Sequence, residues 1–218
     1  MDPDTLPAPL PRGNHGLSRE EVGAAQRGRL LTGMLEVVAE NGYAAATVGA
    51  VLSRARISRQ TFYEHFADKQ DCFLAAFDRS ADHFAALIER SLGSAHDPVL
   101  ERLDRIIEAY LGALAGNPAN ARVFMIEIYA AGYPAVARRL ARSEAFAVVL
   151  ADAVTTGRRW RGGLDPLFVA RSVTGAVGGL VTERINAGDV AGLPGLRPQI
   201  VALVAGLLED DADGDEDR

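Results

Sequence analysis

The sequence contains one cysteine, few aromatic residues and no long apolar run. Because Cys72 stands alone, the chain can form neither an internal disulfide nor a cysteine-based metal site, which is consistent with a reducing compartment. The least polar windows, such as SVTGAVGGLVT, are far too short to span a bilayer. The first residues, MDPDTLPAPLPRG, lack the apolar core of a signal peptide. We therefore expect a cytoplasmic protein with no membrane partner.

Residue arrangements typical of enzymes and metalloproteins are also missing. The sequence has no Ser/His/Asp arrangement, no paired histidines at ligand spacing and no glycine-rich phosphate loop after a strand. It therefore predicts no enzymatic activity, no metal site and no cofactor. Alternating β-branched runs are scarce, which favours an all-α fold.

The net charge of −6 is concentrated at the C-terminus. The last ten residues, EDDADGDEDR, carry seven acids and one arginine, whereas the first 208 residues carry 22 basic and 22 acidic groups. A neutral body with an acidic tail does not exclude a local cationic surface. The overall charge is therefore compatible with a nucleic-acid partner.

Helical periodicity and capping residues divide the chain into a series of helices. The pattern Ser18-x-x-Glu21 fits a capping box that opens the first helix, which closes at Asn41-Gly42. Further helices are predicted over residues 47–54, 58–66, 68–91, 98–116, 118–131, 134–156, 166–186 and 196–208. This layout is a three-helix unit followed by a larger helical bundle.

The segment from Thr47 to Lys69, TVGAVLSRARISRQTFYEHFADK, predicts two short helices joined by a tight turn. On a helical wheel, Phe62 and Phe66 share one face of the second helix, and small polar side chains share the other. A helix that lies in the major groove needs this arrangement, because its apolar back anchors it while its polar side reaches the base edges. Arg59, in the first turn, carries a fork that can reach guanine O6 and N7.

Lys69 gives a second indication. A cation in the first turn of a helix opposes the macrodipole, so its position makes better sense if a phosphate lies beside it. Taken singly, Tyr63 is more typical of a half-buried core residue and His65 of an ordinary surface residue. As a spaced set, these residues favour contact with DNA.

Residues from about 19 to 77 closely resemble the DNA-binding domain of the TetR/AcrR family of bacterial transcriptional regulators. The resemblance rests on NGYAAATV after the first helix and on SRQTFYEHFADK, which follows the family pattern small-x-x-T-[LF]-Y-x-[HY]-F-x-[SDN]-K. It implies that residues 59–61 read or frame bases and that the flanking positions bind phosphate. The DNA-binding residues predicted in this way are Thr47, Ser58, Arg59, Gln60, Thr61, Tyr63, His65 and Lys69.

Arg56 departs from the family pattern, which usually has glycine in the turn between the two helices. Forcing a non-glycine residue to positive φ costs roughly 1 kcal/mol, so either the turn differs slightly or the cost is tolerated. Arg56 is also counted as a DNA-binding residue through a phosphate contact, and the alternative is an exposed turn residue without a partner. Glu64, on the groove face, either accepts from cytosine N4 or points into water.

Glu127 stands among apolar residues in ANARVFMIEIYAAG. Because an unpaired buried carboxylate is costly, we expect it either to pair with an arginine such as Arg122 or Arg138 or to project into a cavity. In the second case it would determine ligand choice. The predicted pocket residues are Phe84, Tyr110, Phe124, Glu127, Ile128 and Trp160, although each aromatic residue among them is by default a core residue.

Interior glycines leave a smooth stripe along VARSVTGAVGGLVTERI, and each costs up to about 1 kcal/mol relative to alanine. Close approach of another helix would explain them. The resemblance implies that this helix and the last one form a four-helix interface with a twofold mate, and the alternative is close packing inside one chain. The predicted interface residues are Ser172, Gly175, Ala176, Gly179, Ile200, Leu203, Val204 and Leu207.

These features predict four regions: a flexible arm over residues 1–17, a helix-turn-helix DNA-binding domain over 18–70, a ligand-binding and dimerisation domain over 71–208, and a disordered acidic tail over 209–218. The predicted function is that of a homodimeric repressor that binds a palindromic operator and is released by a small apolar or amphipathic molecule. The alternative is a helical adaptor or small-molecule-binding protein that does not bind DNA.

Overall fold

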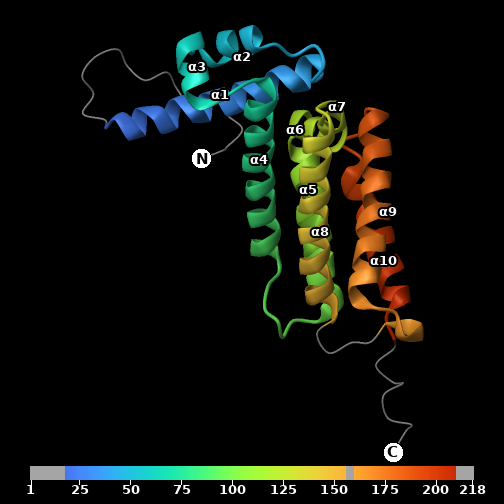
Figure 1. Cartoon of the computed structure of the whole chain (residues 1–218). Helices are drawn as coiled ribbons and strands as arrows, with labels where there is room; N and C mark the ends of the chain where they lie inside the picture. Colours follow the sequence, from blue (N-terminus) through green and yellow to red (C-terminus); the bar gives the residue numbers. More distant parts are fainter. Residues whose placement is uncertain (1–17, 156–159, 210–218) are drawn as a thin grey trace, which may run out of the picture. The chain divides into compact units, whose positions relative to one another are not determined.

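The computed structural model describes residues 18–155 and 160–209, and it confirms the all-α prediction (Figure 1). Within these ranges the only β-type pairing is an isolated bridge between Trp160 and Leu208. The predicted arm and nearly all of the acidic tail lie outside the described residues. The helices are α1 (Arg19–Asn41), α2 (Val48–Ala55), α3 (Arg59–His65), α4 (Lys69–Ser91), α5 (Val99–Gly116), α6 (Pro118–Arg122), α7 (Ile128–Ala130), α8 (Tyr133–Thr155), α9 (Pro166–Asn186) and α10 (Arg197–Leu207).

The first helix begins and ends where its capping residues predict. The Ser18 hydroxyl accepts a hydrogen bond from the Glu21 N–H at 3.1 Å, and the Glu21 carboxylate accepts from the Ser18 N–H at 2.7 Å. This reciprocal capping box satisfies two backbone donors that the helix itself leaves free. At the other end, Gly42 has φ 78° and donates its N–H to the Val38 carbonyl.

The segment predicted as one α-helix over residues 118–131 contains a π-helix, η1 (Val123–Glu127), between α6 and α7. The prediction of regular α-helix was therefore wrong at this point. A π turn accommodates one extra residue and changes the direction in which the following side chains project. Val123, Met125 and Glu127 are all buried within this turn.

The chain forms two compact units that do not follow its linear order. The first contains residues up to His83 together with the segment Arg122–Val136, and the second contains Phe84–Ala121 and the residues from Ala137 onward. The first unit therefore includes the first part of α4, up to His83, and the segment Arg122–Val136, which lies more than thirty residues further along the chain. The predicted domain boundary near residue 70 did not include either of them.

The core of the first unit lies where α1 to α4 meet the 122–136 segment. Among its fully buried side chains are Phe62, Phe73 and Phe77, and the ring of Phe77 stacks on Phe124 at 4.5 Å. Cys72 is also fully buried, and burial raises the pKa of its thiol to about 12. The thiol therefore stays protonated at neutral pH and behaves as a small apolar core group.

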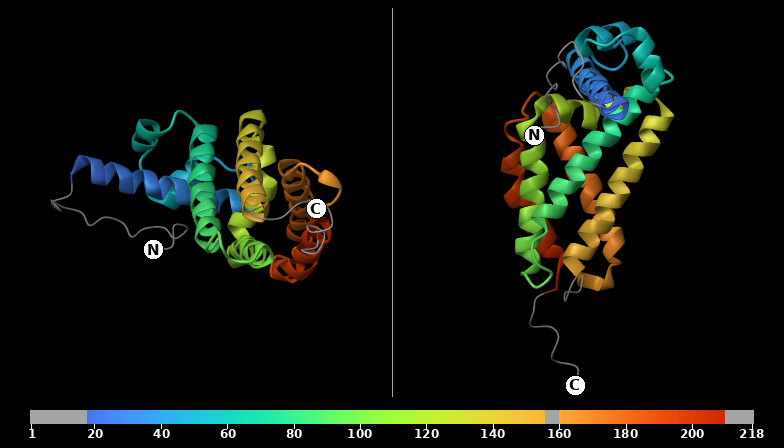
Figure 2. Two further views of the ribbon diagram at one scale, coloured as in Figure 1. Left: turned by 90° about the horizontal axis from the view of Figure 1, so that it is seen from below. Right: turned by 90° about the vertical axis from the view of Figure 1, so that its left-hand side faces the viewer.

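The second unit is a bundle of long, roughly aligned helices, α5, α8, α9 and α10, joined by the end of α4 (Figure 2). Along α5, the apolar residues Leu103, Ile106, Ile107 and Leu111 are fully or almost fully buried. Helix α5 packs against α10 and against the 3₁₀ turn η3 (Leu193–Leu196) that precedes it. Of the helices in the described ranges, none combines the length and the apolar character needed to cross a bilayer.

Candidate nucleic-acid interface

Helix α3 has seven residues and is held by its N-cap and its buried back. The Ser58 hydroxyl accepts from the Thr61 N–H at 3.1 Å and lies 2.9 Å from the Thr61 hydroxyl. Phe62 is fully buried, Phe66 is nearly so, and their ring centroids are 5.7 Å apart. Because so short a helix is marginal in isolation, these contacts are what fix its position.

The opposite side of α3 faces solvent. Tyr63 is 52% exposed, with its ring edge-on to Phe62 at 5.3 Å. His65 is half-buried on the other flank, close to α1, where a Cβ on Gly23 would lie 3.9 Å from the imidazole. Thr61 and Lys69 are also half-buried. The predicted DNA-binding residues that are exposed are Thr47, Arg56, Ser58, Arg59, Gln60 and Tyr63.

Arg56 adopts the left-handed conformation, with φ 54° and ψ 49°, so the turn keeps the geometry that glycine usually supplies. Its N–H donates to the carbonyls of Leu52 and Ser53, and its own carbonyl accepts from the Arg29 guanidinium at 3.3 Å. Arg29 is almost fully buried and also donates to the Ala55 carbonyl. This role of Arg29 was not predicted, because a single arginine in a long helix has no distinguishing sequence pattern.

Of the arginines in α2, α3 and the turn between them, Arg54 forms ion pairs within the chain and the other two do not, among the described residues. Arg54 contacts Glu36 at 3.1 Å and Glu40 at 2.5 Å, which raises its own pKa and lowers the pKa of Glu40. Its charge is therefore neutralised within the chain. Arg56 and Arg59 are exposed and have no ion-pair partner among the described residues, so they supply the positive charge of this surface.

Glu64 accepts a hydrogen bond from the Gln60 amide at 3.1 Å, one helical turn earlier. This contact orients the Gln60 side chain on the exposed face of α3. The two interpretations of Glu64 given above did not include it. Because a carboxylate can accept several hydrogen bonds, Glu64 can keep this contact and still accept from a base.

Lys69 has structural partners that the sequence did not predict. Its ammonium donates to the carbonyls of Tyr43 at 2.9 Å and Ala46 at 3.0 Å, and it lies 4.2 Å from the centroid of the Tyr43 ring. These carbonyls offset the unfavourable position of a cation at the start of α4. An ammonium has three N–H donors, so the two carbonyls leave one for a phosphate. Phosphate binding by Lys69 stays a prediction.

Glu127 reaches the same loop between α1 and α2. Its carboxylate accepts from the Tyr43 N–H at 2.9 Å and contacts Arg122 at 3.1 Å, so the ion pair with Arg122 that the sequence gave as one alternative is present. A Cβ on Gly42 would lie 3.2 Å from the carboxylate, which leaves no space for a side chain there. Together, Lys69 and Glu127 hold the loop that leads into α2.

The six predicted pocket residues are divided between the two units. Phe124, Glu127 and Ile128 belong to the first unit, where Phe124 stacks on Phe77. Phe84 and Tyr110 lie together in the second unit, with ring centroids 5.5 Å apart. Trp160 is 3% exposed at the bridge to Leu208, and its indole N–H has no hydrogen-bond partner in the part of the chain that the structure describes. No cluster that could hold a metal ion occurs in the described ranges.

The predicted dimer face is partly exposed and partly internal. On α9, all four predicted residues are exposed, and a Cβ built on Gly175 or Gly179 would meet no described atom within 4 Å. Packing inside one chain therefore does not explain these glycines. On α10, Leu203 is 52% exposed, but Ile200 and Val204 are buried in their own chain and cannot contribute contact surface as they lie here. The exposed apolar residues Phe168 and Leu180 of α9 were missed.

Comparison with known proteins gives a family match over the N-terminal helices. Residues 30–76 match the family model of bacterial regulatory proteins of the tetR family. The HTH-type transcriptional activator FasR of Mycolicibacterium smegmatis is 30% identical over 118 residues, which are 54% of this chain and 51% of that protein. The fatty acid metabolism regulator protein of Bacillus subtilis is 26% identical over 100 residues, 46% of this chain and 51% of that protein. The chain thus spans about half the length of each.

Solved structures match over most of the chain. The fatty acid degradation regulator FadR of Bacillus halodurans superposes with a TM-score of 0.73 at 18% identity, over 82% of this chain and 94% of that one. FadR of Bacillus subtilis, in complex with stearoyl-CoA, gives a TM-score of 0.69 at 22% identity, over 81% of this chain and 96% of that one. At these identities, the likeness shows a shared fold.

Proposed function

We propose that the chain, whose residues 30–76 match the family model of bacterial regulatory proteins of the tetR family, is a DNA-binding transcriptional regulator whose affinity for an operator responds to a small apolar or amphipathic molecule. The observation that carries the proposal is the presentation of α3. Its back is buried through Phe62, its N-terminus is capped by Ser58, and its front exposes Arg59, Gln60 and Tyr63. A helix held in this way can enter the major groove.

The roles of individual residues follow from their exposure and their partners. Arg59, exposed and without an ion pair among the described residues, would donate to guanine, and Gln60 would contact the neighbouring base. Thr47, Arg56, Tyr63 and His65 would bind the two phosphate backbones. Lys69 would act mainly through the loop that it holds, with one N–H left for a phosphate.

A homodimer is the proposed DNA-binding form, and it would act in the cytoplasm, where bacterial DNA lies. The exposed stripe of α9, with Gly175, Gly179, Phe168 and Leu180, supports this because nothing in the described chain covers it. A twofold axis would place two α3 helices about one DNA turn apart, or a multiple of it, on a palindromic site.

The proposed switch runs through the 122–136 segment. By its contacts this segment belongs to the first unit, whereas its chain neighbours on both sides belong to the second. Glu127, within it, bonds directly to the loop before α2. A ligand that favours one arrangement of the second unit would therefore bias the first, provided that its affinity for the two forms differs.

The proposed output is repression. FasR is named an activator, so the direction of control is tested separately with a reporter gene placed under the selected site. A non-catalytic helical adaptor that does not bind DNA is the alternative. It predicts that substitutions on the exposed face of α3 leave DNA retention unchanged.

The decisive experiment selects bound sites from random duplex DNA with the purified full chain at low ionic strength, and repeats the selection with a panel of metabolites. We expect enrichment of one palindrome and release by at least one panel member. Binding should weaken steeply with salt, because phosphate contacts release counterions. If no palindrome is preferred over scrambled competitor, the regulator proposal is rejected.

A further inference from the structure

Arg102 on α5 is a buried arginine with no ion-pair partner among the described residues. The residue is 6% exposed, and its Nε and Nη1 atoms are buried without any hydrogen-bond partner in the described part of the chain. A guanidinium does not lose its proton in proteins, so the group cannot escape by becoming neutral. Buried polar groups are almost always hydrogen-bonded, and each exception calls for an explanation.

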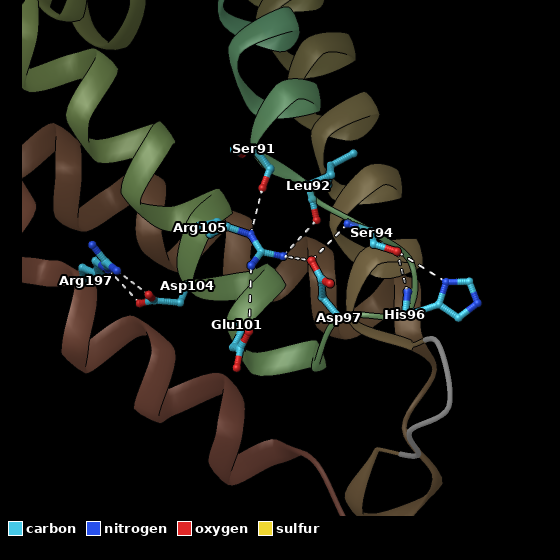
Figure 3. A network of polar contacts seen from close by, with 9 residues as sticks. All are labelled: Ser91, Leu92, Ser94, His96, Asp97, Glu101, Asp104, Arg105 and Arg197. Atoms are coloured by element: carbon cyan, nitrogen blue, oxygen red, sulfur yellow. Dashed lines mark hydrogen bonds and ion pairs between the residues drawn. The ribbon is translucent and has the colours of Figure 1, made fainter.

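The carboxylates closest to Arg102 in sequence are already used (Figure 3). Figure 3 shows Asp104 in contact with Arg197, and Glu101 at 3.9 Å from Arg105. Glu108, which the figure does not draw, also contacts Arg197, at 2.6 Å. Arg105 also contacts Asp97 at 2.6 Å. The acidic residues around the start of α5 therefore pair with Arg105 and Arg197, which are more exposed, and none of them pairs with the buried Arg102.

An apolar cluster follows on the same face of α5. Ile106 and Tyr110 come four and eight residues after Arg102, a spacing that places them along one side of a helix. The Tyr110 ring contacts Phe84 at 5.5 Å and stacks on Phe146 at 5.7 Å. Ile88 and Ala153 are buried in the same cluster. A cation thus stands at the end of an apolar stripe inside the second unit.

The aromatic members of this cluster are not fully covered. Phe84, Tyr110 and Phe146 each keep part of their surface accessible, unlike the fully buried Phe62, Phe73 and Phe77 of the first unit. Burial nevertheless raises the pKa of Tyr110, against the opposing charge of Arg139. These three aromatic residues are therefore the members of the cluster that keep surface available for a further apolar contact.

We propose that Arg102 binds the carboxylate of an amphipathic acid whose alkyl chain lies along Phe84, Tyr110 and Phe146. The inference rests on the proposed function, because it assigns the ligand class of the second unit. A carboxylate accepts two parallel hydrogen bonds from a guanidinium and supplies the missing negative charge. The burial of Arg102 favours this compact head group over the bulky, highly charged nucleotide of a coenzyme A ester.

Calorimetry with the purified full chain compares three probes of equal chain length: hexadecanoate, 1-hexadecanol and hexadecanoyl-CoA. We expect hexadecanoate to bind most tightly. The Arg102→Gln variant should lose about 10- to 100-fold in affinity for hexadecanoate, the ratio expected when a hydrogen bond to a charged group is removed. Affinity for the alcohol should not change.

Thermal unfolding without ligand separates a binding role from a structural one. Arg102→Gln removes an unpaired buried charge, so its melting temperature should equal or exceed that of the parent chain. The matched control is Arg105→Gln, three residues along α5, which should lower the melting temperature because it breaks contacts with Asp97 and the Ser91 carbonyl. The control should bind hexadecanoate as the parent does.

The proposal is overturned if the alcohol binds as tightly as the acid, if only the coenzyme A ester binds, or if Arg102→Gln leaves acid binding unchanged. It is also overturned if removal of residues 210–218 lowers the melting temperature of the parent chain but not that of Arg102→Gln. The acidic tail would then be the partner of Arg102. Operator binding by ligand-free Arg102→Gln distinguishes the acid-binding proposal from the regulator proposal. Loss of acid binding with intact operator binding leaves the regulator proposal standing.

Discussion

At the scale of single residues, the helix-turn-helix surface combines residues that face solvent with residues that hold the scaffold. Tyr63 and Lys69 both fit the sequence pattern of phosphate contacts, yet Tyr63 is exposed whereas Lys69 donates to two loop carbonyls. Side chains of one motif can therefore affect DNA binding by different physical routes. Stability measurements distinguish these routes.

Replacement of Tyr63 by phenylalanine should weaken operator binding about 5- to 10-fold, the effect of one lost hydrogen bond, without changing the melting temperature. Lys69→Ala should weaken binding and also lower the free energy of unfolding by about 1–3 kcal/mol, because two carbonyls lose a charged donor. Fluorescence anisotropy and thermal unfolding measure the two effects. Tyr129→Phe is the control for Tyr63, since Tyr129 is 53% exposed outside the α2–α3 surface. Equal losses for both tyrosines would contradict the assignment.

Arg56 offers a test in which stability and DNA binding move in opposite directions. Its left-handed backbone strains a residue with a Cβ, so Arg56→Gly should raise the free energy of unfolding by up to about 1 kcal/mol. The same change removes an unpaired cation, and it should lower operator affinity and reduce the salt slope by about one. Chemical denaturation and a salt titration of binding provide the measurements. Arg56→Ala keeps the strain while removing the charge, so it should lose affinity without gaining stability.

At the scale of elements, the loop between α1 and α2 is held from two sides. Lys69 at the start of α4 binds its carbonyls, and Glu127 at the end of η1 binds its Tyr43 N–H. Glu127 is the last residue of the π turn and is buried there. The loop leads directly to Thr47, whose hydroxyl caps α2 by accepting from the Ala50 N–H at 3.1 Å.

Glu127→Ala should lower the free energy of unfolding by about 2–4 kcal/mol, because it leaves the Tyr43 N–H buried without an acceptor and frees Arg122. Glu127→Gln keeps an oxygen for that N–H and should cost less than half as much. The operator affinity of the alanine variant should fall even under conditions where the chain is fully folded. Chemical denaturation monitored by circular dichroism gives the first quantity, and anisotropy gives the second. If glutamine and alanine cost the same, the hydrogen bond to the loop contributes nothing measurable.

At the scale of the whole molecule, the exposed stripe of α9 is the feature that one chain does not satisfy. Glycines inside a helix lower its stability. At Gly175 and Gly179, no described neighbour in the chain lies close enough to require the absence of a side chain. Phe168 and Leu180 leave apolar surface on the same helix. A second copy that packs along this stripe would account for both observations.

Gly179→Glu should convert the proposed dimer to monomer, since the twofold axis would bring two buried carboxylates together. The melting temperature of the isolated monomer should not fall, because the added side chain enters open space. Light scattering coupled to size exclusion gives the mass. Gly112→Glu is the matched control, because a Cβ on this α5 glycine also meets no neighbour within 4 Å. A control that also dissociates would point to a general effect of added charge.

The sequence by itself determined that the described chain is helical, where α1 begins and ends, the capping box at Ser18 and Glu21, and the amphipathic pattern of α3. These depend on local spacing, which is written in neighbouring residues. Only the tertiary structure decided that Lys69 and Glu127 hold one loop, that Ile200 and Val204 are internal, and that two buried nitrogens of Arg102 lack a hydrogen-bond partner among the described residues. Such facts depend on which segments meet across long stretches of chain, and no local period encodes these meetings. The π turn belongs with them, because its stabilising contact at Tyr43 lies 84 residues away from Glu127.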